Sequence, residues 1–141
     1  ALSSAASDVY KRQLQARAMF ARKIEAAVLA ATEDIGVSLE KYAADDQSGR
    51  SVTDQSGEGN DLAMSIAQQV IRNTHTIKTT RYLKSNNQFT VFVCMEYAGD
   101  ENTLVDHIEQ NVKDRISQDD RAKIEQRHNQ FRQRILGNLK E

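Results

Sequence analysis

The chain has 141 residues, of which 19 are basic and 20 are acidic, so its formal net charge at pH 7 is −1. This length suits a single domain with a real hydrophobic core. A near-balanced charge argues against nucleic acid as the main partner, because phosphate binding needs a basic surplus on one face. The single cysteine, Cys94, excludes an internal disulfide. No apolar run is long enough to span a bilayer.

The first residues look foreign to the rest of the chain. Residues 3–13, SSAASDVYKRQ, resemble one reading frame of a transposon-based DNA sequencing adapter, residue for residue. We therefore expect residues 1–13 to be a non-native, adapter-derived segment and leave them out of the fold predictions. The natural N-terminus would then be missing upstream of Leu14.

Residues 14–33 predict a helix, because apolar residues recur along one face of it. Gly36 interrupts that pattern. Ile35, Val37 and Leu39 then alternate with small or polar residues, and this period of two predicts a strand over 35–42. A second helix is expected from Asn60, a plausible N-cap, to about residue 73.

Between these elements, residues 44–60 are rich in Asp, Gln, Ser and Gly, which predicts a long loop. Asp54, Ser56, Glu58 and Gly59 have the opening spacing of a calcium-binding loop. The twelfth position of such a loop needs a bidentate Glu, and Ser65 stands there instead. A flexible polar loop is the simpler interpretation, and an ion- or ligand-binding loop is the alternative.

A β-hairpin is expected next, with strands over 75–83 and 89–97. An odd-length loop around residues 85–87 places apolar residues on one face and polar residues on the other, whereas a two-residue loop mixes them on both. The register with one apolar face is therefore expected. Its pairs are Leu83 with Phe89, Tyr82 with Thr90, Thr79 with Val93, Lys78 with Cys94, Ile77 with Met95 and Thr76 with Glu96.

The C-terminal third predicts two helices, 101–116 and 118–139. Ser117 followed by Asp120 has the spacing of a capping box at the start of the second helix. Glu109 and Lys113 form a supporting pair one helical turn apart. The second helix has a narrow apolar stripe with a wide polar surround, so we expect it to pack only partly on its own domain and to mediate self-association. The stripe contains Ile124, His128, Phe131, Ile135 and Leu139.

Three segments carry a family resemblance: the alanine-rich 17–31, residues 35–42 (IGVSLEKY), and the hairpin 76–97. Together they resemble the bacterial twenty-kilodalton envelope lipoprotein family (LPP-twenty), a domain similar to the N-terminal domain of the flagellar assembly protein T. The resemblance covers roughly residues 14–97. It implies a structural or adaptor protein of the periplasm or outer membrane, with a lipid anchor on a cysteine upstream of Leu14. It supplies no catalytic residues.

No catalytic set emerges from the residues themselves. His75, His107 and His128 lie on different elements, and metal or base chemistry needs such groups at close spacing. Cys94 has no histidine near it in sequence, so an inert thiol is expected. The candidate interaction residues are Lys78, Tyr82 and Lys84 of the hairpin, with Phe131 and Ile135 of the last helix. We expect no catalytic residues, cofactor or metal, and no enzymatic activity.

These observations predict an α+β fold of two layers, in which a strand and a β-hairpin form a small antiparallel sheet covered by helices. Residues 14–97 would form the lipoprotein-family domain, and residues 98–141 a C-terminal helical extension packed on it. The expected function is a structural or adaptor module of the bacterial envelope. It would bind other envelope proteins, or itself through the C-terminal helix. Nucleic acid is not expected as a partner, and a membrane only through the lost lipid anchor.

Overall fold

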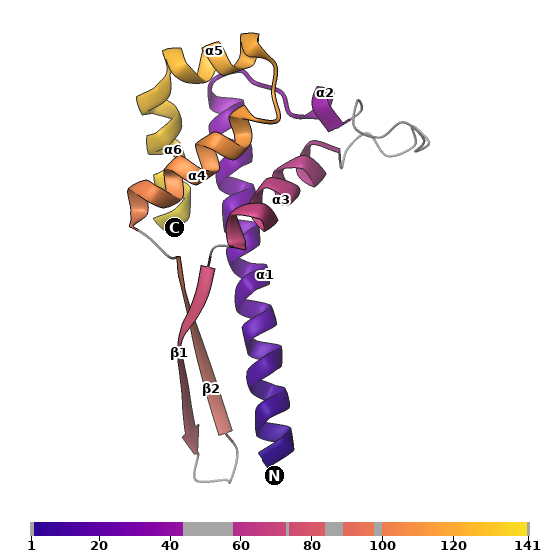
Figure 1. Ribbon diagram of the computed structural model, residues 1–141, viewed down its shortest axis with the longest axis vertical. Coiled ribbons are helices and arrows are strands. Elements are labelled where there is room, and N and C mark those ends of the chain that lie inside the picture. The colour runs from indigo at the N-terminus through magenta and orange to yellow at the C-terminus, as the bar shows by residue number, and fades with distance from the viewer. Residues whose placement is uncertain (1, 44–57, 73, 84–88, 98–99, 141) are drawn as a thin grey trace.

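The structure, a computed structural model, describes residues 2–43, 58–72, 74–83, 89–97 and 100–140, and the side chains of 10–42, 61–72 and 100–140. In chain order the elements are α1 (Leu2–Asp34), α2 (Glu40–Ala43), α3 (Glu58–Ile71), β1 (Thr74–Leu83), β2 (Phe89–Tyr97), α4 (Glu101–Lys113), α5 (Gln118–Gln126) and α6 (His128–Lys140). Figure 1 shows the helices gathered in a body at one end of the molecule, with the N-terminal half of α1 and the hairpin extending from it.

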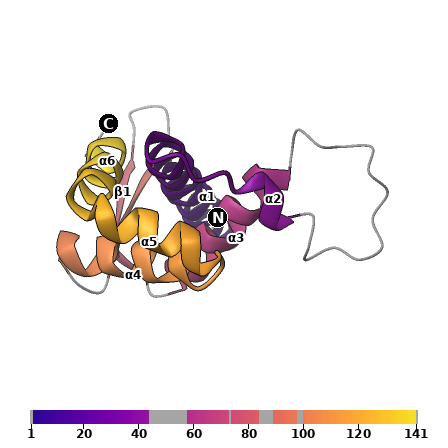
Figure 2. The same cartoon turned by 90° about the horizontal axis from the view of Figure 1, so that it is seen from above.

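The body is built from the C-terminal half of α1 together with α3, α4 and α6. α1 contacts both α3 and α6, and α4 contacts the same two helices. Seen from above, α5 lies across the end of this group (Figure 2). The alanines of α1 allow close helix approach, since Ala27 and Ala31 are fully buried. The other fully buried aliphatic residues of the four packed helices are Ile24, Val28, Ala63, Ile66, Ala67, Val70, Val105, Ile108, Val112 and Ile135.

The segment after α1 is not a strand, so the predicted strand 35–42 is wrong. Gly36 has a φ of 78°, a left-handed conformation that glycine adopts without steric cost. Its N–H donates to Glu33 O, and the N–H of Val37 donates to Thr32 O, a typical end for a helix. Ile35, Val37 and Leu39 are all buried, as their alternation suggested. They line an irregular segment that leads into α2, and no strand pairs with it in the described residues.

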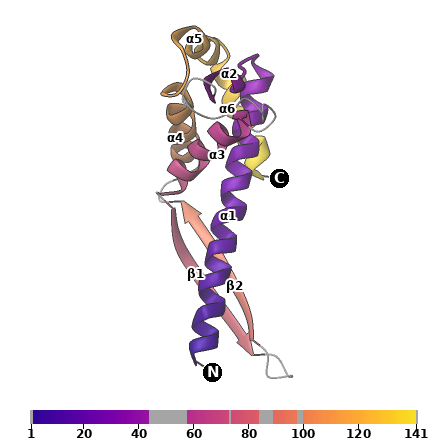
Figure 3. The ribbon, with the colours of Figure 1, turned by 90° about the vertical axis from the view of Figure 1, so that its right-hand side faces the viewer.

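The predicted two-layer α+β fold is therefore also wrong. The described part of the chain is predominantly helical, and its only β structure is the two-stranded hairpin. The hairpin does not form a layer beneath the helices of the body. It runs alongside the N-terminal half of α1 (Figure 3), and its contacts with that helix are made mainly through β2.

The hairpin register follows the predicted one over most of its length. Leu83 pairs with Phe89, Tyr82 with Thr90, Thr79 with Val93, and Lys78 with Cys94, which confirms those four pairs. An irregularity between Thr76 and Lys78 then shifts the register by one residue. Met95 therefore pairs with Thr76 and not with Ile77, and Glu96, predicted opposite Thr76, lies opposite His75, so these two predicted pairs are wrong. The turn expected around residues 85–87 lies outside the described residues.

The C-terminal residues form three helices where two were predicted, since the chain breaks again at Arg127, between α5 and α6. The proposed surface role of Phe131 and Ile135 is wrong, because both side chains are fully buried. α6 packs along α1, and Leu136 and Leu139 are also partly buried against the core. Its narrow apolar stripe is thus covered by the chain's own first helix, not left for a partner.

Candidate functional site

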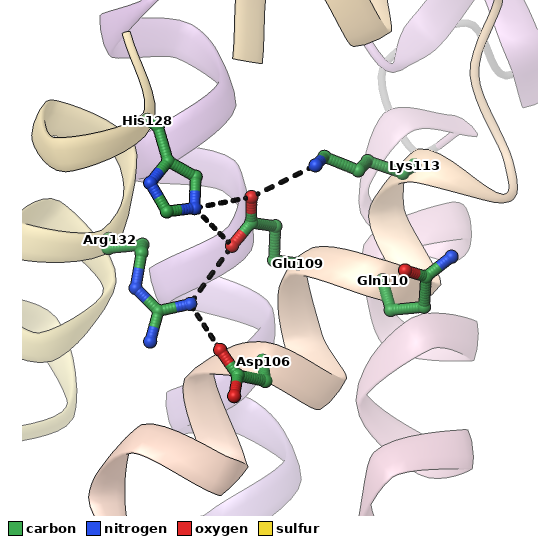
Figure 4. A pocket seen from close by; sticks show the side chains of 6 residues that line it. All are labelled: Asp106, Glu109, Gln110, Lys113, His128 and Arg132. Atoms are coloured by element: carbon green, nitrogen blue, oxygen red, sulfur yellow. Dashed lines mark hydrogen bonds and ion pairs between the residues drawn. The ribbon is translucent and has the colours of Figure 1, made fainter. Parts of the chain in front are cut away.

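A buried carboxylate lies between α4 and α6. The Glu109 side chain is 6% exposed, and it faces two side chains that α6 presents one turn apart, those of His128 and Arg132. Its Oε1 atom lies 3.0 Å from His128 Nε2 and 3.2 Å from Lys113 Nζ. Its Oε2 atom accepts a hydrogen bond from Arg132 Nη1 at 3.0 Å. Figure 4 shows these groups converging on Glu109, with Asp106 next to Arg132.

The charges of this network balance one another. Arg132 Nη1 also contacts Asp106, at 2.5 Å, so one guanidinium nitrogen serves both carboxylates. Burial alone would lower the pKa of Arg132, but its hydrogen bonds to Asp106 and Glu109 raise that pKa above its usual value. Oε1 of Glu109 makes no hydrogen bond of good geometry, and its charge is balanced by Lys113 Nζ at 3.2 Å.

This cluster, which we call the Glu109 cluster, borders an open cavity of about 510 Å³. An imidazole beside a carboxylate can transfer protons. Here, however, the contacts of Glu109, His128 and Arg132 are made with one another, and they join α4 to α6. The geometry is that of a clamp between two helices, in which Glu109 Oε1 is left without a hydrogen bond. The cavity is lined by Asp106, Glu109, Gln110, Lys113, His128 and Arg132.

A second buried carboxylate, Asp120, lies at the other end of the body. Its side chain is 2% exposed and pairs with Lys41 Nζ at 2.7 Å and with Lys123 Nζ at 3.5 Å. It also accepts a hydrogen bond from the hydroxyl of Tyr42. Burial by itself would raise the pKa of Asp120, but the hydrogen bonds from Lys41 and Tyr42 and the nearby positive charge outweigh it. The net effect holds the pKa below its usual value.

The capping box predicted at Ser117 is half confirmed. The Ser117 side chain accepts a hydrogen bond from the N–H of Asp120, as an N-cap should. Asp120 does not reach back to the Ser117 N–H; that group donates instead to the Tyr42 hydroxyl, at 3.1 Å. Tyr42, from the end of α2, therefore completes the cap and fixes α2 to α5. We call these residues, with Lys41, the Tyr42 latch.

Several residues that the sequence singled out lie where their side chains are not described. Lys78 and Tyr82 lie in β1, opposite Cys94 and Thr90. Lys84 lies outside the described residues, as do residues 44–57 of the predicted loop. Glu58 and Gly59 begin α3, so the last two residues of the calcium-like spacing are helical. Among the described residues, no group of three or more His, Cys, Asp and Glu side chains could hold a metal ion.

A region rich in basic residues emerges when the fold is combined with the sequence. We define the arm as residues 9–23 of α1 together with β1 and β2. Contacts between α1 and β2 hold its two parts side by side (Figures 1 and 3). All but one of the 20 acidic residues lie outside the arm, and the exception, Glu96, is near the end of β2 that leads into the body. The basic residues within it are Lys11, Arg12, Arg17, Arg22, Lys23, Lys78 and Arg81.

The sequence carried a signal for this arm that the overall charge concealed. No Asp or Glu occurs over residues 9–24 or over residues 62–95. From Arg72 onwards, every third residue up to Lys84 is basic or histidine. These stretches are far apart along the chain, so only the fold brings them together. The Glu109 cluster was signalled only by the Glu109–Lys113 pair, which the structure confirms at 3.2 Å.

Comparisons with protein-family models, curated proteins and solved structures found no match to this chain. Of the helices described, none combines the length and the apolar character needed to cross a membrane.

Proposed function

We propose that the protein acts by binding and not by catalysis, as an adaptor module whose working surface is the arm and whose partner carries negative charge. The observation that supports this best is the separation of charge along the molecule. The chain as a whole has a net charge of −1, yet its acidic residues are almost all outside the arm. A region of one charge sign attracts an oppositely charged partner and orients it.

The state of the buried charged groups supports a non-enzymatic role. The Glu109 cluster joins α4 to α6, and the Tyr42 latch joins α2 to α5. In each cluster, hydrogen bonds and ion pairs join one helix to another.

Location in the periplasm or at the outer membrane of a bacterium is part of this proposal. Its support is the resemblance of residues 17–31, 35–42 and 76–97 to the envelope lipoprotein family, and no comparison adds to it. Of those segments, 35–42 differs from the strand that was expected there. An adaptor in that compartment would meet both acidic proteins and anionic surfaces, and a basic arm suits either kind of partner.

Chromatography on immobilised heparin, a polyanion, tests the arm directly. At pH 7 the protein is net negative, so an even charge distribution predicts that it flows through. We expect retention that salt reverses, because exposed charges are screened at high ionic strength. The variant Arg17→Gln/Arg22→Gln should elute at distinctly lower salt. Both side chains are exposed on α1, and Gln keeps the helix propensity of Arg.

The matched control is Arg127→Gln/Arg134→Gln, which removes the same charge from two exposed positions of the body. It should elute with the unmodified protein. If both double variants shift equally, net charge and not the arm governs retention. That result, or flow-through of the unmodified protein, would contradict the proposal.

A further inference from the structure

We propose that the anionic partner is the surface of a lipid bilayer that contains acidic phospholipid, on which the arm lies at the headgroup level. This inference rests on the proposed function and names its partner. It is built on Leu14 and the residues after it, so it does not depend on the adapter-like residues 1–13.

The charge of the arm meets the first requirement of an anionic membrane surface. Arg17, Arg22 and Lys23 are exposed on α1, and Lys78 and Arg81 belong to β1 of the hairpin that runs alongside this helix. A Lys or Arg near an anionic leaflet strengthens binding about fivefold, and the attraction acts only within a Debye length of the surface. Several such residues on one projecting part of the molecule therefore make a cumulative contact, whereas the same charges scattered over the body would not.

The apolar side chains of the arm distinguish a bilayer from other polyanions. Among the side chains that the structure describes beyond the adapter-like residues, the large hydrophobic ones that are exposed both lie on this part of α1: Leu14 at 50% and Met19 at 62%. The phosphates of a nucleic acid make no favourable contact with such apolar side chains. The boundary between headgroups and acyl chains accepts such side chains.

The rest of the molecule sets the orientation. Most of the acidic residues that the structure describes lie in the body, so an anionic surface repels it while attracting the arm. The body lies at one end of the long α1 and the arm at the other (Figure 3), which lets the arm touch the bilayer while the body stays away from it. The binding is peripheral, since no described helix could span the bilayer.

Sedimentation of the full chain with sucrose-loaded vesicles tests this inference. One set of vesicles is pure phosphatidylcholine, and the other contains phosphatidylcholine and phosphatidylglycerol in equal amounts. We expect binding to the mixed vesicles only, with Arg17→Gln/Arg22→Gln weakening it about 20- to 30-fold for the two lost charges. Arg127→Gln/Arg134→Gln should bind like the unmodified protein.

A second variant separates lipid from other polyanions. Leu14→Gln/Met19→Gln keeps every charge and changes two exposed side chains, so the fold should remain intact by far-UV circular dichroism. We expect about tenfold weaker binding to the mixed vesicles and unchanged elution from heparin. Equal vesicle binding by this variant would overturn the lipid inference, as would tighter binding to duplex DNA than to the vesicles at the same salt.

The two proposals fail in different ways. Retention on heparin without binding to the mixed vesicles would overturn the lipid inference and leave the adaptor proposal standing. Failure on both supports would overturn both.

Discussion

The hydroxyl of Tyr42 lies 2.9 Å from Ser117 Oγ, 75 residues further along the chain. It also donates to the buried carboxylate of Asp120 and accepts from the Ser117 backbone N–H. One side chain on a four-residue helix thus completes the N-terminus of α5. This contact fixes α2, which ends at Ala43, against the C-terminal third of the protein.

Replacing Tyr42 with Phe should therefore destabilise the protein by about 1.5 kcal/mol. The hydroxyl binds a charged group, and its loss leaves the Ser117 N–H without a partner and removes one hydrogen bond from Asp120. Urea unfolding followed by circular dichroism measures the effect. Tyr10→Phe, at a side chain that is 63% exposed, is the matched control and should leave the midpoint unchanged. Equal midpoints for the two variants would mean that the Tyr42 latch contributes nothing.

Asp120 should make stability depend on pH in the acid range. Its pKa in the folded protein is lower than the ordinary value of 3.8, so the folded state binds protons less readily than the unfolded state. The resulting stability is fully present above the unfolded pKa and is lost as pH falls through the lower, folded value. As pH falls from the unfolded pKa to the folded pKa, the free energy of unfolding of Asp120→Asn should therefore decrease less than that of the unmodified protein.

Urea midpoints measured from about pH 6 down to about pH 2.5 follow this loss, since the window lies around the carboxyl pKa. Asp119→Asn is the control, because it changes an exposed carboxylate in the same helical turn. The urea midpoint of this control should fall with decreasing pH as steeply as that of the unmodified protein. A profile for Asp120→Asn as steep as that control would assign the pH dependence to other carboxylates.

Neutralising the Glu109 cluster should also destabilise the body. Glu109→Gln leaves Lys113, His128 and Arg132 close together without their shared carboxylate. Breaking a fully buried ion pair costs more stability than breaking a pair at the surface, and Glu109 lies between these cases. We therefore expect the free energy of unfolding to fall by about 2 kcal/mol. Glu125→Gln removes the same charge from a side chain that is 68% exposed and 4.0 Å from Lys113, and it should cost less than about 0.5 kcal/mol. Thermal unfolding of the two variants side by side would show whether the clamp matters.

The burial of α6 predicts that the C-terminal helices are required for folding. Phe131→Ala should cost about 3–5 kcal/mol, because it leaves a cavity at a fully buried position. Met19→Ala, at a side chain that is 62% exposed, should stay within about 0.5 kcal/mol. A chain that ends at Ser117 lacks the helix that covers α1 and should show no cooperative unfolding transition. A stable, cooperative truncated protein would place α6 outside the core after all.

Local sequence signals predicted the structure correctly wherever the backbone hydrogen bonds form within one element or between adjacent strands. The helix periodicity over 14–33 lies within α1, and the apolar face of the hairpin fixed the pairing of Leu83 with Phe89. Ser117 was identified as an N-cap from its own type and its neighbours, since the cap bond to Asp120 N–H spans three residues. Each of these signals depends on contacts within a short stretch or between adjacent strands.

The two fold errors share a physical cause. Alternating burial at Ile35, Val37 and Leu39 is real, but a strand also needs a partner for its backbone, and none pairs with it among the described residues. The narrow stripe of α6 suggested a helix at the periphery. It is buried because the alanine-rich face of α1 lets another helix approach closely. Both outcomes depend on what another segment offers, which periodicity within one segment does not report.

The sequence alone determined where helices and strands begin and end over most of the described chain, because those boundaries arise from nearby residues. The tertiary structure decided which charges act together. Net charge sums all residues with equal weight, whereas electrostatic attraction falls off within a Debye length and depends on spatial neighbours. By laying residues 9–23 beside β2, the fold turns two distant stretches without acidic residues into one basic arm on a nearly neutral protein.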